Sequence, residues 1–469
     1  MKFPKGGTDT RSDDRGRAVD ERPEDERPPL RQMVVYGLQH ILSLYTGVIT
    51  PPLIVAAALG LNPTDTALII SAALLVSGLM TLVQTLGVWR FGIRMPLVIG
   101  TSFTPVTAMI AIGDSHGLPV VFGASIVAGL FGILIAPVIA GLIRFFPPVV
   151  TGSVITIIGI TLMPVAVGWI TEGGQDGVPT GVDMLLAGAT LAIILVLTKV
   201  LRGAWNRSAI LIGMLLGTLL AASLGRLDLG SVGEGPAFSL PAFFHFGPPE
   251  FQVAAIVTMS IVMVVILAEG MADILGVGQV VGSRIDGRRL ADGLRADAAM
   301  AVVGPLFNSF PGSTFSQNIG LIALSRVKSR YVVATGAAFL VAMGLFPFLG
   351  QIVAVIPSAV LGGTGLVLFG SVAAAGIQTL GKADYEGTNN LIIVAVSLGL
   401  GILSIASPTF FSAFPDWASM ILSSGVVTAT ISALLLNVFF EVLGSGRRKS
   451  PEPAPEPAPD EAEPSGVGG

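Results

Sequence analysis

Long apolar stretches alternate with short polar breaks along most of the chain, from residue 32 to residue 442. A helix needs about 20 predominantly apolar residues to cross the hydrocarbon core of a membrane. The pattern predicts fourteen membrane-crossing segments, in order 32–61, 66–88, 97–112, 118–145, 149–170, 182–201, 209–224, 253–275, 290–307, 315–324, 331–355, 359–377, 391–406 and 418–442. The third and the tenth segments are too short to cross as plain helices, which sets them apart from the others.

The distribution of positive charge supports this count. If the N-terminus lies in the cytoplasm and every segment crosses, 25 of the 26 Lys and Arg residues fall in cytoplasmic tails and loops, and only Arg226 falls outside. Cytoplasmic loops of membrane proteins carry an excess of Lys and Arg. Because losing one segment would scramble this asymmetry, we expect fourteen crossings in the cell membrane with both termini in the cytoplasm.

Composition narrows the class of protein. Hydrophobic residues make up 52% of the chain and charged residues only 12%, against about 25% charged residues in soluble domains. The chain has no Cys and three His, so we expect no disulfide, no metal site and no cofactor. Residues 1–30 are charged and mixed in sign, and residues 444–469 are rich in Pro, Glu and Ala. Both are predicted to be disordered tails that flank a transporter domain at 31–443.

An internal repeat links the two short segments. Residues 100–105 read Gly-Thr-Ser-Phe-Thr-Pro, and residues 312–317 read Gly-Ser-Thr-Phe-Ser-Gln, at an offset of 212. A second match, Phe-Pro at 146–147 against Ile-Pro at 356–357, has an offset of 210. We therefore expect two repeats of seven segments, and because seven is odd the second repeat must be inverted relative to the first.

Small and hydroxylated residues around a Phe suit an extended piece of chain that leads into a half-helix. We expect residues 99–104 and 311–316 to be extended and to pair near the membrane centre. Irregular backbone at this depth survives only where it is buried in protein or lines a wet cavity. Interrupted segments at matched positions of two repeats mark the binding site of many transporters.

Few ionisable side chains lie inside the predicted segments. Glu269 lies in the eighth segment with Asp273 one turn further on, Asp297 lies in the ninth, and His40 lies in the first. A carboxylate at membrane depth is costly unless it is paired, protonated or wetted. This favours a functional role for Glu269. For Asp297 the alternative is a hydrogen bond that locks helices together, Asp273 fits either interpretation, and His40 is more typical of a hydrogen bond between helices.

The tenth segment carries a motif. Gln317-Asn318-Ile319-Gly320, followed after four residues by Ser325-Arg326, resembles the signature of the nucleobase–ascorbate transporter family. The chain departs from this signature at Ser325, where Thr is usual, and the change keeps the hydroxyl group. The pair Gln39-His40, the Glu269–Asp273 spacing and Asp297 also match the family, and the similarity runs from about residue 32 to residue 442.

The resemblance implies a fold of two inverted repeats in which the third and tenth segments cross as short antiparallel strands joined to half-helices. It implies a core domain at about 31–145 and 251–355, a gate domain at about 149–225 and 359–443, and a homodimer in the lipid bilayer. It also implies a nucleobase ligand.

The roles that follow from the resemblance belong to two sets of residues. Glu269 would accept hydrogen bonds from the base, Gln317 would contact it through both amide atoms, and backbone N–H groups near Phe103 and Ser316 would meet its carbonyl oxygens. The rings of Phe103 and Phe315 could pack against the base, although ordinary packing is the alternative. Supporting roles would fall to Asp297, Asn318, Asp273 and His40.

An amide at position 317 offers both a donor and an acceptor and suits the edge of an oxopurine. We therefore expect a secondary active transporter that imports xanthine or uric acid, with a uracil permease as the alternative. A proton, carried by Glu269 or Asp297, is the expected coupling ion, and sodium remains open. An anion transporter of the same fold would need a basic residue near the half-helices. No enzyme motif is recognisable, and we expect no nucleic-acid partner.

Overall fold

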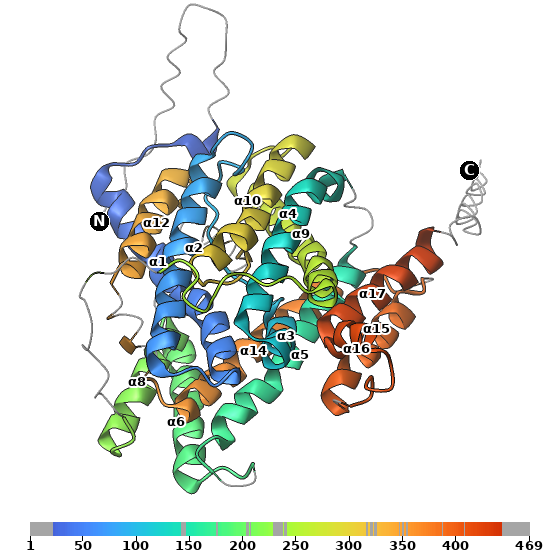
Figure 1. Cartoon of the computed structure of the whole chain (residues 1–469). Helices are drawn as coiled ribbons and strands as arrows, with labels where there is room; N and C mark the ends of the chain where they lie inside the picture. Colours follow the sequence, from blue (N-terminus) through green and yellow to red (C-terminus); the bar gives the residue numbers. More distant parts are fainter. Residues whose placement is uncertain are drawn as a thin grey trace, which may run out of the picture.

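A computed structural model describes residues 22–141, 147–174, 177–202, 206, 208–227, 238, 242–315, 318, 322, 326–346, 348, 351–352, 355–386, 388–407 and 409–442. The described chain is mainly helical (Figure 1). Its helices are α1 Leu30–Ala58, α2 Pro63–Leu86, α3 Val106–His116, α4 Leu118–Gly141, α5 Pro148–Thr171, α6 Gly181–Val200, α8 Ala209–Ser223, α9 Val253–Val281, α10 Gly287–Leu306, α12 Arg330–Gly344, α14 Ser358–Leu380, α15 Asn390–Ala406, α16 Asp416–Ser423 and α17 Gly425–Asn437.

Seven of the described helices are long and apolar enough to cross a membrane, namely α1, α2, α4, α5, α6, α9 and α14. Four further apolar helices are shorter: α8, α12, α15 and the helix at 425–440. The described chain is therefore a multi-pass helical membrane protein. Many large apolar side chains on α6, α8 and α15 are exposed, as expected for surfaces that face lipid.

Local sequence sets several helix ends. At the start of α2 the side chain of Asn62 accepts a hydrogen bond from the backbone N–H of Asp65. Thr180 and Asp183 form a reciprocal capping box at the start of α6. The helix α9 ends at Gly282, which adopts the left-handed conformation that glycine allows without strain.

The helices pack in two groups. The first group contains α1, α2, α4, α9, α10 and α12, which contact one another, and α3 lies against α1, α4 and α9. The second group contains α5, α6, α8, α14, α15 and α17. In Figure 1 the first group fills the upper part of the view, whereas α15, α16 and α17 lie together at the right. Because α9 contacts α5, α16 and α17 as well as its own group, it lies at the junction of the two.

Two short strands from the two halves of the chain pair inside the first group. Strand β1 (Ile99–Thr101) runs antiparallel to β2 (Gly312–Thr314), with Gly100 opposite Ser313. Bonds from Ser102 N to the Pro311 oxygen and from Phe315 N to the Val98 oxygen extend the pairing by one residue at each end. Both strands are fully buried, and the short helix α3 begins five residues after β1.

Residues 22–29 differ from the disordered tail that their composition predicts. The structure places them against the ends of α9, α10 and α12, where Arg289 donates to the buried carboxylate of Glu24 at 2.8 Å and Arg330 donates to Asp25 at 2.7 Å. The reason is that acidic residues of this segment form ion pairs with arginines that are far away in the sequence, and composition alone does not reveal such pairs.

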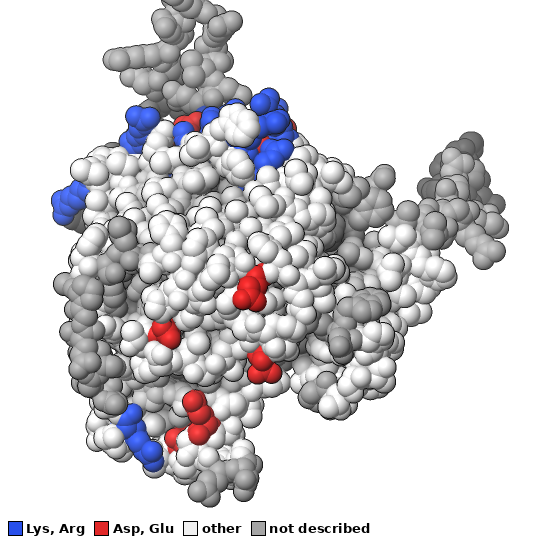
Figure 2. Space-filling model, viewed as in Figure 1, with Lys and Arg blue, Asp and Glu red and all other residues white. Residues whose placement is uncertain are grey.

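Figure 2 shows the visible Lys and Arg side chains gathered mainly at one end of the molecule.

Candidate functional site

Glu269 lies beside the end of the first strand. It projects from α9, and its Oε2 accepts a hydrogen bond of 2.7 Å from the hydroxyl of Thr104. Thr104 is buried and lies between β1 and α3, and its own backbone N–H donates to the hydroxyl of Ser102. Glu269 is only partly buried. A partly accessible carboxylate is thus held in a fixed position between the end of β1 and the start of the short helix α3.

Asp297 lies behind the second strand. Its carboxylate is fully buried on α10 and accepts a hydrogen bond from the hydroxyl of Thr314 in β2, with distances of 3.0 Å to Oδ1 and 3.3 Å to Oδ2. The side-chain amide of Gln84 on α2 lies 3.5 Å from the same Oδ1. Asp297 therefore holds β2 in place. Its side chain is fully buried, whereas that of Glu269 is partly accessible.

His40 and Asn318 form a third polar contact. Nε2 of His40 on α1 and Oδ1 of Asn318 are 2.5 Å apart, and both side chains are buried. The amide nitrogen of Asn318 donates to the backbone oxygen of Pro96, just before β1, at 2.5 Å. Asn318 thus ties the residues after β2 to α1 and to the residues before β1.

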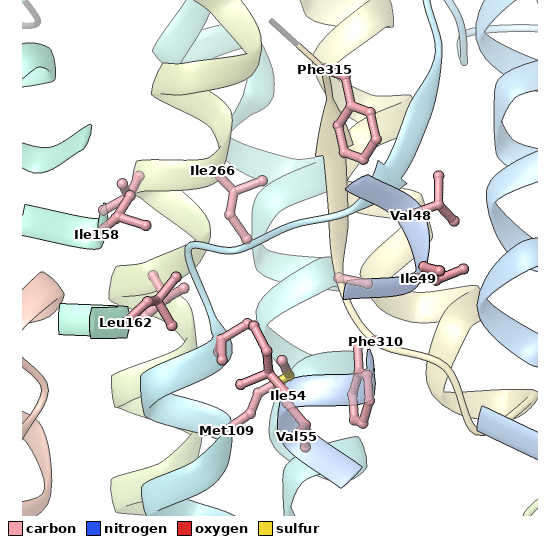
Figure 3. Packing of buried hydrophobic residues seen from close by; sticks show 14 of the residues in the cluster. Val48, Ile49, Ile54, Val55, Met109, Ile158, Leu162, Ile266, Phe310 and Phe315 are labelled. Carbon is pink, nitrogen blue, oxygen red and sulfur yellow. The ribbon is translucent and has the colours of Figure 1, made fainter. Parts of the chain in front are cut away.

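The two aromatic rings of the repeat have different surroundings. The partly exposed Phe103 meets Phe369 of α14 edge to face, with 6.3 Å between ring centroids, and Phe369 in turn lies 6.3 Å from Trp169 of α5. Phe315 is buried instead, over Gly100 of β1 and Gly47 of α1. Figure 3 shows Phe315 in the same cluster of buried apolar residues as Val48 and Ile49 of α1. Phe103 therefore faces the second helix group, whereas Phe315 belongs to the interior of the first.

Some predicted site residues are not in these contacts. Ser316 and Gln317 lie outside the described residues, as does Ser325 of the motif. Asp273 is half-buried one turn beyond Glu269 on α9. Within the described ranges it is not among the residues that hydrogen-bond to the strands or their flanks.

Four residues of the site escape the sequence-based prediction. Thr104 stands in the first copy of the repeat directly after Phe103, and Thr314 stands in the second copy, so the repeat itself was a usable signal. Gln84 is a lone amide in an apolar run, which marks it only as unusual. Phe369 is one of many apolar residues of α14, and its position opposite Phe103 depends on the packing of the two helix groups.

The arrangement suits the binding of a small polar ligand. In the described part of the chain, Glu269 and Asp297 hydrogen-bond to residues of the strands or their ends, and His40 bonds to Asn318 after β2. No group of three or more His, Asp or Glu side chains that could hold a metal ion occurs among the described residues. A fixed carboxylate can accept hydrogen bonds from a small molecule, and an aromatic ring beside it can stack on a planar one. Fold and site together define a multi-pass membrane transporter.

Comparison with known proteins identifies the family. The xanthine/uracil permease profile, described as the Permease family, matches residues 31–410. The chain is 40% identical to the uric acid permease PucK of Bacillus subtilis (strain 168) over 87% of this chain and 96% of that protein. It is 39% identical to the uric acid transporter UacT of Escherichia coli (strain K12) over 90% and 89% of the two chains. The Bacillus subtilis xanthine permease is 38% identical over 89% and 95%.

The protein belongs to this permease family, which confirms the resemblance to the nucleobase–ascorbate transporters, and it is a transporter and not an enzyme. Solved structures share its fold. The transmembrane domain of the cyanobacterial bicarbonate transporter BicA superposes with a TM-score of 0.60 at 17% identity, over 88% of this chain and all of that one. SLC26A9 gives a TM-score of 0.62 at 11% identity, over 88% and 66%. At these identities the comparison concerns the fold alone.

Proposed function

We propose that the protein is a secondary active transporter that imports an oxopurine, xanthine or uric acid, across the cell membrane. Relatives at 38–40% identity include uric acid permeases and a xanthine permease. The observation that carries the proposal is the Glu269 carboxylate, held by Thr104 at the junction of β1 and α3. An oxopurine presents ring N–H groups, and an anionic oxygen at a fixed position is a strong acceptor for them.

In this proposal Glu269 accepts hydrogen bonds from the ring N–H groups of the base, and the ring of Phe103 lies against it. Gln317 contacts the base through both atoms of its amide, and backbone N–H groups near Phe103 and Ser316 meet its carbonyl oxygens. Phe315 supports this surface from the interior side. Asp297, Asn318 and His40 hold the strands, and Asp273 has a supporting role.

The two helix groups correspond to the two domains of the proposed transporter, a core and a gate. We assign the group around α1, α2, α9 and α10 to a substrate-binding core and the group around α5 and α14 to a gate, within fourteen segments arranged as two inverted repeats. The contact between Phe103 and Phe369 crosses from one group to the other. A proton, carried by Glu269 or Asp297, couples to transport, because a carboxyl group can bind and release a proton whereas the amide of Gln317 cannot.

The orientation and assembly belong to the same proposal. Both termini lie in the cytoplasm, because the Lys and Arg residues gather at one end of the molecule, and the transporter works as a homodimer. The chain has no cysteine, so single cysteines can be introduced directly. Labelling of a cysteine at position 328 by an impermeant reagent added outside intact cells would contradict this orientation.

Uptake of labelled xanthine, uric acid, uracil and adenine in a strain without its own base transporters tests the function. We expect concentrative uptake of an oxopurine. A charge-assisted hydrogen bond contributes about 1.5–3 kcal/mol, so Glu269→Gln should weaken substrate affinity roughly ten- to hundredfold and abolish accumulation. Glu386→Gln, at an exposed carboxylate, is the matched control and should behave as wild type. Preferred uptake of uracil would favour the uracil permease alternative.

A normal Glu269→Gln protein would show that the site has been placed on the wrong carboxylate. Asp297→Asn is therefore measured in parallel. Because Asp297 holds β2 from behind, its substitution should weaken binding through the displaced strand and should impair transport by a larger factor than binding.

A further inference from the structure

The side-chain amide of Gln84 lies where four elements meet. Gln84 is fully buried on α2, near its C-terminal end. Its Nε2 lies 3.3 Å from the backbone oxygen of Gly293 on α10, 3.3 Å from the hydroxyl of Thr314 on β2 and 3.5 Å from Oδ1 of Asp297. Its Oε1 accepts a hydrogen bond of 3.2 Å from the backbone N–H of Ile93, in the segment that leads to β1.

The partners fix the orientation of this amide. The backbone oxygen of Gly293 can only accept, so the amide nitrogen must face it. The backbone N–H of Ile93 can only donate, so the amide oxygen must face it. The main chain of Gln84 adds a further link, because its backbone oxygen accepts from the N–H of Arg94 at 2.9 Å.

These bonds form a directed chain of donors. The N–H of Ile93 donates to Gln84, the amide of Gln84 donates to the hydroxyl of Thr314, and that hydroxyl donates to Asp297. Hydrogen bonds arranged in one direction polarise and strengthen one another, and a buried chain of this kind is costly to interrupt. This series of hydrogen bonds begins at Ile93 in the first half of the sequence and ends at Asp297 in the second half.

Asp297 has little freedom on its remaining side. A Cβ built on Gly270 of α9 would lie 2.3 Å from Oδ2 of Asp297. Gly270 is the residue after Glu269, so the backbone that carries the ligand-binding carboxylate rests directly on Asp297. Movement of Asp297 would therefore disturb both β2 and the helix that presents Glu269.

We propose that Gln84 is a positioning residue for substrate binding. It fixes Asp297 and Thr314, and through them it fixes β2 and Glu269 relative to β1. It has no contact with substrate in this role. The inference rests on the proposed function only for the identity of the substrate, since the bonds that carry it are independent of any ligand.

Two readouts test the proposal on purified full-length protein. The first is the dissociation constant for xanthine and for uric acid, and the second is the thermal unfolding midpoint without ligand. Gln84→Met keeps the length of the side chain and removes the amide, and we expect it to raise the dissociation constant at least tenfold. Thr85→Val is the control, because Thr85 is equally buried at the next position of α2 but its hydroxyl bonds only within its own helix. Its binding should match that of wild type.

A double-mutant cycle separates positioning from general loosening. If Gln84 acts through Asp297, the double variant Gln84→Met/Asp297→Asn should bind within about threefold of the weaker single variant, and the shifts in unfolding midpoint should likewise not add. Gln84→Glu, which keeps the shape but places an acceptor where a donor is needed, should bind as poorly as Gln84→Met. Additive effects on both readouts, or unchanged affinity in Gln84→Met, would overturn the proposal.

The two readouts also separate this proposal from the proposed function. If the wild-type protein binds neither purine, the substrate assignment fails, and the additivity of the unfolding midpoints still decides whether Gln84 holds Asp297. If the wild type binds a purine and Gln84→Met binds it equally well, the proposed transport function is supported and the proposed positioning role of Gln84 is wrong.

Discussion

The two strands of the site have matching sequences and different surroundings. After β1, Phe103 is partly exposed and meets Phe369 of the second helix group, and Thr104 holds Glu269. After β2, the equivalent Phe315 is buried in the first helix group. The first copy of the repeat thus directs Phe103 toward the second helix group and Thr104 toward Glu269, whereas the second copy contributes its ring to the interior of the first helix group. The two copies share an extended backbone, and their side chains have different surroundings.

The largest expected difference concerns the glycines that open the two copies. A Cβ on Gly312 would lie 2.3 Å from the backbone oxygen of Gly100, whereas a Cβ on Gly100 would lie 2.4 Å from the ring of Phe315. Backbone in a paired strand cannot move without breaking the pair, but a ring can shift. We expect Gly312→Ala to leave no folded protein in detergent. Gly100→Ala should fold with a loss of about 1–3 kcal/mol, as for an overpacked core.

Fluorescence-detected size-exclusion chromatography and thermal unfolding measure both glycine variants. Ser313→Ala, in the same strand as Gly312, controls for substitution in β2. Equal damage from Gly312→Ala and Gly100→Ala would show that the two strands respond alike.

The aromatic pair gives the next largest effect. Phe315→Ala removes a buried ring and should lower the free energy of unfolding by about 3–5 kcal/mol. Phe103→Ala should lower it much less, because its ring is partly exposed, and should instead raise the KM for uptake at nearly unchanged expression. Thermal unfolding and uptake kinetics of both variants make the comparison. A Phe103→Ala protein that loses stability and keeps its KM would reverse the roles assigned to the two rings.

The sequence predicts the outline of this site because backbone preferences are local. Glycine and hydroxylated residues marked both strand positions, and apolar runs placed several helices within a few residues, such as 149–170 against α5 Pro148–Thr171. The division between Phe103 and Phe315 could not be predicted in this way. It depends on Gly47 of α1 and on Phe369 of α14, which lie far from the repeat in sequence.

The segment at 22–29 teaches the same lesson for charged residues. Its composition is that of a disordered tail, and its packing depends on Arg289 and Arg330, more than 260 residues away. Gln84 is a further example, because an amide in an apolar run does not reveal which partners it has. Long-range partners determine the function of a polar residue, whereas its immediate neighbours determine the local backbone.

The smallest expected effect concerns Thr104, in the first copy of the repeat. Thr104→Val keeps the shape of the side chain and removes the hydroxyl that donates to Glu269. Without this bond the carboxylate can rotate away from the ligand, so the KM for the oxopurine should rise about five- to thirtyfold, which corresponds to about 1–2 kcal/mol. Thr107→Val is the control on α3, because the buried hydroxyl of Thr107 has no hydrogen-bond partner among the described residues. It should leave uptake unchanged and stability equal or slightly higher. An unchanged KM in Thr104→Val would mean that Glu269 keeps its position without the strand end, and the first copy of the repeat would then contribute to the site only through Phe103.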